Sequence, residues 1–342
     1  MNAKQLDQTA RDLVAPGKGI LAADESTGTI EKRFKGIGLA NSEPNRQAYR
    51  DLLFTTGGFG EFISGVILYD ETLRQKSVKG PSFVEVLQKS GSIPGIKVDK
   101  GTVPLPGSPE EKMTEGLDGL RGRLEEYKKL GARFAKWRAV ITIGKGIPTA
   151  RCITVNARGL ALYAALCQEH GIVPIVEPEV LMDADNTIER CYEVTEWTLT
   201  ETFSELRNLG VALDGMLLKP NMVIAGKKSP KQATVEEVAR WTVACFRRVV
   251  PAEVPGIVFL SGGQTSQQAT AHLNAMNAMG PHPWQLSFSY GRALQDEALK
   301  AWKGDAKNLA AAQKAFSDRA KLNAAARHGK YSEKMERELV GV

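Results

Sequence analysis

The chain has 342 residues, of which 42% are hydrophobic and 25% are charged, with a formal net charge of +6. This composition is typical of a globular protein with a large core and argues against a disordered chain. The longest apolar stretches, such as Ile172–Val176 and Gly256–Leu260, are far shorter than the roughly 20 residues of a spanning helix, so no membrane partner is expected.

The N-terminus and the cysteines predict a cytoplasmic protein. No apolar segment follows a basic one at the start of the chain, so no secretory signal is expected. Cys152, Cys167, Cys191 and Cys245 stand singly without CxxC spacing, which indicates free thiols in a reducing compartment. Lysines and arginines are dispersed rather than gathered in a basic stripe, which favours a small polyanionic ligand over nucleic acid.

Eight short apolar or β-branched runs recur along the chain, and each ends in polar or glycine residues. They predict strands over Gly19–Ser26, Phe62–Asp70, Ile93–Gly101, Phe134–Ile141, Ile172–Val180, Asp214–Met222, Gly256–Gln264 and Gln285–Arg292. Helical periodicity between them predicts helices over Ser108–Gly131, Ala157–Gly171, Thr187–Gly210 and Thr234–Val249. A leading helix is expected over about Asn2–Val14, and solvent-exposed helices from Gln295 to about Leu339.

Strands that alternate with helices favour a (β/α)8 TIM barrel, with an N-terminal helix and a C-terminal helical extension. We expect one barrel domain over residues 1–342. A doubly wound open sheet is the alternative. That fold usually has a GxGxxG turn after its first strand, which Asp24–Gly28 does not match.

The C-terminal ends of the predicted strands, where barrels place their reacting groups, carry many charges. These ends include Asp24-Glu25-Ser26, Lys97-Val98-Asp99-Lys100, Lys136-Trp137-Arg138, Glu177-Pro178-Glu179 and Lys219-Pro220-Asn221. Because residues i and i+2 of a strand share a face, Lys136 and Arg138 project together, as do Glu177 and Glu179. A structural ion network or an outward-facing orientation is the alternative for any one pair, but six charged strand ends favour a functional site.

Lys219 follows the apolar run Met216–Leu218 and precedes Pro220, which places its amine at the rim of the barrel. A free lysine is only about one part in 2,500 neutral at pH 7, so attack on a ketone requires surroundings that disfavour protonation. Partial burial and a second cation have this effect, and Lys136, two strands away, is the expected cation. Glu177 lies between them and could shuttle protons. A lysine that merely extends to the rim is the alternative.

Two glycine turns predict a phosphate pocket. Ser261–Thr265 follows the seventh strand and Tyr290–Arg292 follows the eighth, where barrels bind phosphate. Lys100, Lys32 and Arg33 could hold a second phosphate farther across the mouth.

Metal and cofactor sites are not expected. The four histidines, His170, His272, His282 and His328, lack metal-ligand spacing, and neither a P-loop nor a dinucleotide fingerprint is present.

These residues lie in motifs that resemble those of the class I fructose-1,6-bisphosphate aldolases, over nearly the whole chain except its end. The motifs are Gly19–Ser26, Thr102–Leu105, Ala135–Arg138, Ile175–Glu179, Leu217–Met222, Phe259–Gln264 and Ser287–Leu294.

The resemblance implies roles for five residues in catalysis. Lys219 would form a Schiff base with the ketose, and Glu177 would be the acid and base of imine formation. Lys136 and Glu179 would hold charges and protons around it. Asp24 would orient and help deprotonate the C4 hydroxyl whose collapse breaks the C3–C4 bond. The iminium would accept the electrons of that bond, so no metal is needed.

The resemblance also implies two phosphate subsites. The C1 phosphate would lie on Ser261, Gly262, Gly291 and Arg292. Lys100 and Arg138 would face the C6 phosphate, and Ser26 is also expected to contact the substrate.

The implied activity is that of a lyase of glycolysis and gluconeogenesis. It would cleave fructose 1,6-bisphosphate reversibly to dihydroxyacetone phosphate and glyceraldehyde 3-phosphate, in a homotetramer. Sedoheptulose 1,7-bisphosphate or fructose 1-phosphate is an alternative substrate, and a catalytically idle scaffold is an alternative of another class. Eukaryotic members end in a tail with a terminal Tyr, whereas this sequence ends Glu338–Val342. Another group is therefore expected to protonate the enamine, or that step is slow.

Overall fold

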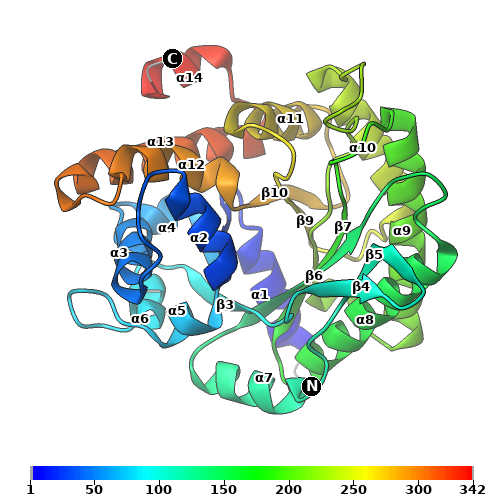
Figure 1. Ribbon diagram of the computed structural model, residues 1–342, viewed down its shortest axis with the longest axis horizontal. Helices are drawn as coiled ribbons and strands as arrows, with labels where there is room; N and C mark the ends of the chain where they lie inside the picture. Colours follow the sequence, from blue (N-terminus) through cyan, green and yellow to red (C-terminus); the bar gives the residue numbers. More distant parts are fainter. Residues whose placement is uncertain (1–2, 341–342) are drawn as a thin grey trace.

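Eight parallel strands close into a barrel in the computed structural model, which describes residues 3–340 (Figure 1). Around the barrel the order is β1-β10-β9-β8-β7-β6-β3-β2. The strands are β1 (Gly19–Ala23), β2 (Ile63–Leu68), β3 (Ile93–Lys97), β6 (Phe134–Ile141), β7 (Val173–Val180), β8 (Leu217–Leu218), β9 (Gly256–Phe259) and β10 (Gln285–Tyr290). Each lies within one predicted run, so the (β/α)8 prediction is confirmed. Most are shorter than their runs, because the polar residues at the C-terminal ends lie beyond the ladder.

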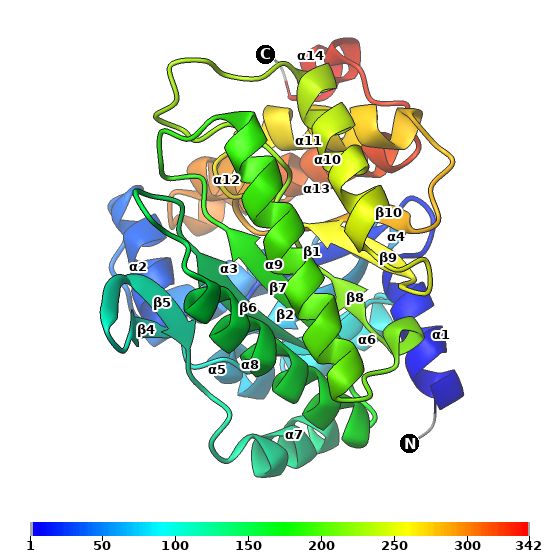
Figure 2. The same ribbon diagram turned by 90° about the vertical axis from the view of Figure 1, so that its right-hand side faces the viewer.

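Helices surround the barrel, and α8, α9 and α10 lie side by side on its outside (Figure 2). The helices are α1 (Ala3–Leu13), α2 (Thr27–Lys35), α3 (Glu43–Phe54), α4 (Phe59–Phe62), α5 (Asp70–Arg74), α6 (Phe83–Lys89), α7 (Leu120–Lys129), α8 (Ala150–Glu169), α9 (Ile188–Asn208), α10 (Val235–Val249), α11 (Ser266–Ala278), α12 (Arg292–Trp302), α13 (Leu309–Arg327) and α14 (Glu333–Val340). The predicted leading helix is present over its described part. No described helix is long and apolar enough to cross a membrane.

The predicted helix over Ser108–Gly131 is wrong in its first part. Ser108–Thr114 forms β5, which pairs antiparallel with β4 (Thr102–Leu105), and helix α7 begins only at Leu120. The buried Glu111 accepts hydrogen bonds from the backbone N–H and hydroxyl of Thr149, at 2.7 Å each. This tertiary contact outweighs the helical propensity of the segment.

The C-terminal extension is helical as predicted, but it is not solvent-exposed throughout. Phe316, Arg319 and Asn323 of α13 are each no more than 1% exposed. Arg319 forms a buried ion pair with Glu336 of α14. Helix α13 packs against α11 and α12, so its polar residues are part of the interior.

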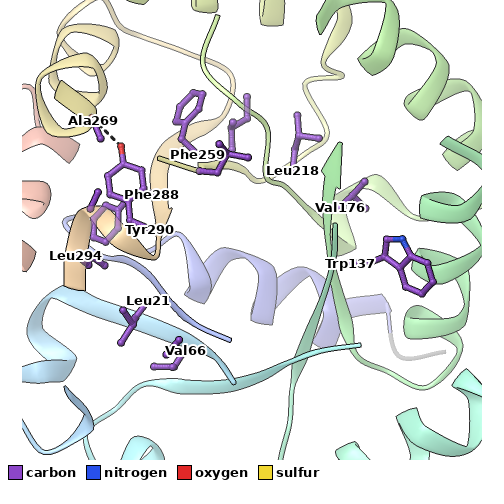
Figure 3. Close-up of a cluster of buried hydrophobic side chains, with 14 of the residues drawn as sticks. Leu21, Val66, Trp137, Val176, Leu218, Phe259, Ala269, Phe288, Tyr290 and Leu294 are labelled. Carbon is purple, nitrogen blue, oxygen red and sulfur yellow. Dashed lines mark hydrogen bonds between the residues drawn. The ribbon is translucent and has the colours of Figure 1, made fainter. Parts of the chain in front are cut away.

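Alternate residues of the barrel strands pack in two different cores. Leu21, Trp137, Val176 and Leu218 face outward, where they meet the surrounding helices (Figure 3). The strand residues that face inward belong to a separate cluster, which includes Ile20, Phe134, Ile175 and Leu217. They pack against Leu6, Ala10 and Leu13 of α1 and against Val14, which follows that helix. Helix α1 therefore closes the barrel at the N-terminal ends of the strands with apolar side chains. The N-terminal half of the lumen is packed, so within residues 3–340 the opposite end is the one that is open to a ligand.

Candidate active site

The strands place charged side chains directly above the apolar layer of the lumen. Phe134, Ile175 and Leu217 belong to that layer. Two residues further along the same strands are Lys136, Glu177 and Lys219. Since side chains on one face of a strand recur every second residue, these three point into the lumen. The hydrophobic layer beneath them removes water from one side of each charge.

A cavity of about 500 Å³ opens at this end of the barrel. Its lining is Ala22, Asp24, Glu25, Ser26, Thr29, Lys32, Arg33, Lys97, Lys136, Arg138, Glu177, Glu179, Lys219, Leu260, Ser261, Gly262, Ser289, Gly291 and Arg292. Such a volume accommodates a small phosphorylated metabolite.

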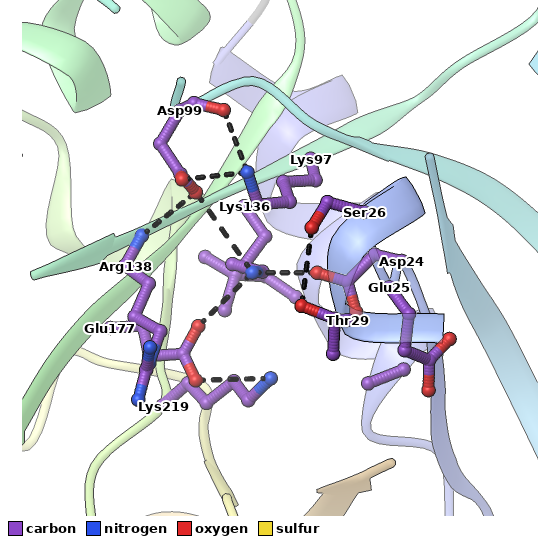
Figure 4. A network of polar contacts seen from close by, with 12 residues as sticks. Asp24, Glu25, Ser26, Thr29, Lys97, Asp99, Lys136, Arg138, Glu177 and Lys219 are labelled. Atoms are coloured by element: carbon purple, nitrogen blue, oxygen red, sulfur yellow. Dashed lines mark hydrogen bonds and ion pairs between the residues drawn. The ribbon is translucent and has the colours of Figure 1, made fainter. Parts of the chain in front are cut away.

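Glu177 bridges the two lysines of the lumen (Figure 4). Its Oε1 lies 3.2 Å from Lys219 Nζ, and its Oε2 lies 3.5 Å from Lys136 Nζ. All three side chains are buried, with the Lys219 side chain only 5% exposed. One carboxylate can thus exchange a proton with an amine on either side.

Lys136 is paired with three carboxylates. Its Nζ lies 2.6 Å from Asp24, 3.5 Å from Glu177 and 3.9 Å from Asp99. Burial by itself would lower the pKa of Lys136, but these negative charges outweigh burial and raise it. Burial would likewise raise the pKa of Asp24, but the charges of Lys136 and Lys219 outweigh it and lower that pKa. Both groups are therefore charged at neutral pH.

Arg138 and Glu179 form a second pair farther out on the same two strands. The Arg138 guanidinium donates to Glu179, and the backbone N–H of Arg138 donates to Asp99 at 3.3 Å. Burial would lower the pKa of Arg138, but the charge of Glu179 and its hydrogen bond raise it. The predicted co-projection of Lys136 with Arg138, and of Glu177 with Glu179, is observed.

The glycines of the two predicted phosphate turns lie beside charged side chains. A Cβ at Gly262 would lie 3.0 Å from Glu179 Oε1. A Cβ at Gly291 would lie 3.5 Å from Arg33 Nη2. Arg33 therefore lies beside the Gly291–Arg292 turn, whereas the sequence interpretation placed it farther across the mouth. A glutamate, Glu25, holds Arg33 there through an ion pair of 2.7 Å.

The cavity contains every predicted site residue except Lys100. Lys100 lines a neighbouring hollow of about 520 Å³, which shares Ser26 and Lys97 with the cavity.

Several residues of the site were given no role from the sequence. They are Glu25, Thr29, Lys97, Asp99 and Ser289. Lys97 pairs with Asp99 at 2.7 Å, and its ladder partner is Lys136. The same two-residue spacing that identified Lys136 and Arg138 could have identified Lys97 and Asp99.

The charge of the cavity suits an anion. Seven cationic and four acidic side chains line it, an excess of three positive charges when every lysine is counted as charged. In the described part of the chain, no group of three or more His, Cys, Asp or Glu side chains is arranged to hold a metal ion.

Comparisons with known proteins agree on one family. A family model described as fructose-bisphosphate aldolase class-I matches residues 5–340. A "Probable fructose-bisphosphate aldolase class 1" of Xanthomonas campestris is 59% identical, over 97% of this chain and 99% of its own. A "Fructose-bisphosphate aldolase 1" of Toxoplasma gondii is 56% identical, over 96% of this chain and 91% of its own.

The fold comparison points the same way. A co-crystal structure of fructose-bisphosphate aldolase from Plasmodium falciparum superposes with a TM-score of 0.95 and 53% identity, and it covers 96% of each chain. The chain belongs to the class I fructose-bisphosphate aldolase family.

Proposed function

We propose that this protein cleaves fructose 1,6-bisphosphate reversibly to dihydroxyacetone phosphate and glyceraldehyde 3-phosphate, through a Schiff base on Lys219. The observation that carries the proposal is the bridging position of Glu177, 3.2 Å from Lys219 and 3.5 Å from Lys136. An amine nucleophile, a proton carrier and a fixed cation are thereby assembled in one buried cluster.

In the proposed reaction Lys219 gives a proton to Glu177, and the uncharged amine attacks the C2 ketone. Glu177 passes that proton to the oxygen, which becomes the carbinolamine hydroxyl, and takes up a second proton from the nitrogen. Glu177 returns a proton to the carbinolamine hydroxyl, which leaves as water and yields the iminium. Lys136 and Glu179 hold the charges around Glu177 during these transfers.

Carbon–carbon cleavage then requires a base for the C4 hydroxyl, and we assign this role to Asp24. Its proximity to Lys136, at 2.6 Å, keeps it ionised and ready to accept the proton. The electrons of the C3–C4 bond move onto the iminium, so the first product remains as a neutral enamine while the aldehyde departs. Protonation at C3 and hydrolysis release dihydroxyacetone phosphate and the free lysine.

We assign the two ends of the substrate to the two ends of the cavity. Ser261, Gly262, Gly291 and Arg292 would hold the C1 phosphate, with Arg33 beside them. Ser26, Lys97 and Arg138 would face the C6 phosphate, with Lys100 in the adjoining hollow. With Lys219 uncharged, the cavity lining still has two more positive than negative side chains, which favours a phosphorylated ligand.

Three further proposals concern the protein as a whole. Residues 1–342 would form one barrel domain. Copies would assemble as a homotetramer, which the exposed Val155, Leu162 and Trp197 on α8 and α9 favour as apolar contact surface. The protein would act in the cytoplasm. Its four buried free thiols support this, and so does the name of a relative from Arabidopsis thaliana that is 55% identical over 96% of this chain, "Fructose-bisphosphate aldolase 5, cytosolic".

Borohydride reduction in the presence of dihydroxyacetone phosphate, followed by peptide mass mapping, tests the proposal. We expect one adduct, on Lys219, and none in Lys219→Met. In Glu177→Gln, adduct formation should slow by about 10²-fold, because proton transfer is impaired. An adduct on another lysine, or unchanged turnover in Lys219→Met, would refute the assignment.

A further inference from the structure

The segment that carries Lys219 has very little strand structure to hold it. Strand β8 consists of Leu217 and Leu218 alone. The ladder to β7 ends where the backbone N–H of Lys219 donates to Val176 at 2.8 Å. Pro220 has no N–H to continue it. Contacts other than the ladder hydrogen bonds must therefore fix the position of Lys219 along β7.

The side chain of Asn221 takes the place of the missing ladder. Its Oδ1 accepts a hydrogen bond from the backbone N–H of Val180 at 3.0 Å. Its Nδ2 donates to Thr195 Oγ1 on α9 and to the Met222 carbonyl, at 3.1 Å each. The residue is 0% exposed. Leaving a buried amide without hydrogen-bond partners is energetically costly, so the Asn221 side chain has one favourable orientation.

The two contacts with β7 bracket the acid–base residues. One joins Lys219 to Val176, and the other joins Asn221 to Val180. Glu177 and Glu179 lie between these two points of β7. The segment is also tied to the next strand, because the Pro220 carbonyl accepts the N–H of Leu260 at 3.2 Å, immediately before Ser261.

We propose that Asn221 is a positioning residue that sets the register of Lys219 against Glu177 and thereby the rate of imine formation. It lines no part of the cavity and so acts through Lys219 rather than on the substrate. The inference rests on the proposed function. A shift of about 1 Å in a reacting group costs on the order of 10²-fold in rate. Loss of the hydrogen bond between Asn221 and Val180 should therefore slow the step that depends on the 3.2 Å contact between Lys219 and Glu177.

The test compares Asn221→Leu with Asn323→Leu. Asn323 is a matched control, because it is also 0% exposed and bonded on both amide atoms, but it lies on α13 with Thr270 and Arg319 as partners. For each variant, one measures the rate of borohydride-trapped adduct formation with dihydroxyacetone phosphate. The kcat and KM of fructose 1,6-bisphosphate cleavage and the urea unfolding free energy are measured alongside.

Asn221→Leu should slow trapping and kcat by about 10- to 100-fold. Its KM should stay within about threefold of wild type, because the phosphate contacts lie on other elements. Asn323→Leu should lose similar stability but trap at the wild-type rate. A wild-type trapping rate in Asn221→Leu overturns the inference, and so does equal slowing in Asn323→Leu.

If Asn221→Leu does not fold, Thr195→Val tests the positioning role of Asn221 instead. It removes one partner of the Asn221 amide and keeps the shape of the side chain. Trapping should slow by about threefold with KM unchanged, by the same misplacement argument; a wild-type rate overturns the inference. Absence of any wild-type adduct on Lys219 would instead refute the proposed function, so the two failures are distinguishable.

Discussion

Lys136 illustrates how single residues of the site depend on one another. Of its three carboxylate partners, Glu177 and Asp99 have side chains that are 4% and 3% exposed, and Asp24, which lines the cavity, is 13% exposed. These largely buried acids depend on Lys136 for much of their counter-charge, which Lys97 also supplies to Asp99 and Lys219 to Glu177. The pKa of Asp24 is lowered in the folded state, so its contribution to stability exists above the ordinary carboxyl pKa and is lost as the pH falls through the lowered value.

Lys136→Met should therefore destabilise the protein in a pH-dependent way. We expect a loss of about 3 kcal/mol in the free energy of unfolding at pH 7, because buried carboxylates lose their counter-charge. The loss should shrink at pH 4, where burial without Lys136 lets Asp24 take up a proton. Urea titrations at both pH values measure the difference, and an equal loss at both would contradict this account. Lys97→Met should reduce the free energy of unfolding at pH 7 by less, because the Lys97 side chain is 16% exposed whereas that of Lys136 is 4% exposed.

The β4–β5 hairpin shows the same dependence between elements. Glu111 of β5 accepts bonds from Thr149, which caps the N-terminus of α8, and from Ser108 at 2.8 Å. Thr114 of the hairpin also donates to the Arg138 carbonyl at 2.8 Å. The hairpin therefore joins α8 to the strand that carries Arg138.

Glu111→Gln should loosen this junction. Burial would raise the pKa of Glu111, but the hydrogen bonds from Thr149 and Ser108 lower it. Its stabilising effect is therefore present above the ordinary carboxyl pKa and lost in acid. We expect about 2 kcal/mol less stability at pH 7, with faster amide exchange at Cys152. Urea unfolding and hydrogen exchange measure these effects. Glu110→Gln, on the exposed neighbouring residue, should change neither.

At the scale of the whole molecule, Arg327 of α13 links the segment after α1 to β10. The buried Arg327 donates to the carbonyls of Val14 and Leu286 at 2.7 Å each and to that of Ala15 at 2.9 Å. These carbonyls belong to the segment after α1 and to β10. Arg327 is 6% exposed, and this burial lowers its pKa to about 10.

Arg327→Met should destabilise the fold by about 3 kcal/mol, because three carbonyls lose their donor. A fall in Tm and in urea midpoint would measure it. Lys321→Met, on the exposed face of the same helix, is the control and should leave both unchanged. Wild-type stability in Arg327→Met would show that the fold does not depend on this contact.

The four cysteines give a second test at this scale. All four are buried and free, and burial raises the pKa of each thiol, to about 12 for Cys152. Since the thiolate is the reactive form, native protein at pH 8 should react with essentially no Ellman's reagent. The same protein in urea should show all four thiols. Rapid reaction of the native protein would mean that the helices α8 to α10 open readily.

The barrel and much of the site were predictable because the relevant physics is local. Buried parallel strands require apolar runs, and side chains alternate between the two faces of any strand. That alternation places Lys136 on the same face as Arg138, and Glu177 on the same face as Glu179, but only the folded barrel shows that this face is the lumen. The family resemblance rests on the same strand-end motifs, and the comparisons confirm it.

Tertiary contacts decided the rest. The sequence was sufficient to predict the eight barrel strands, the charges at their ends and the family. It could not show that Arg33 lies by Gly291, that Lys100 lies in the adjoining hollow, or that Ser108–Thr114 forms a strand. Loops carry no period, so the place of a loop residue depends on which distant element it meets. The buried Arg319 and Glu111 are likewise stable only because partners far along the chain supply their hydrogen bonds, and no local pattern encodes such partners.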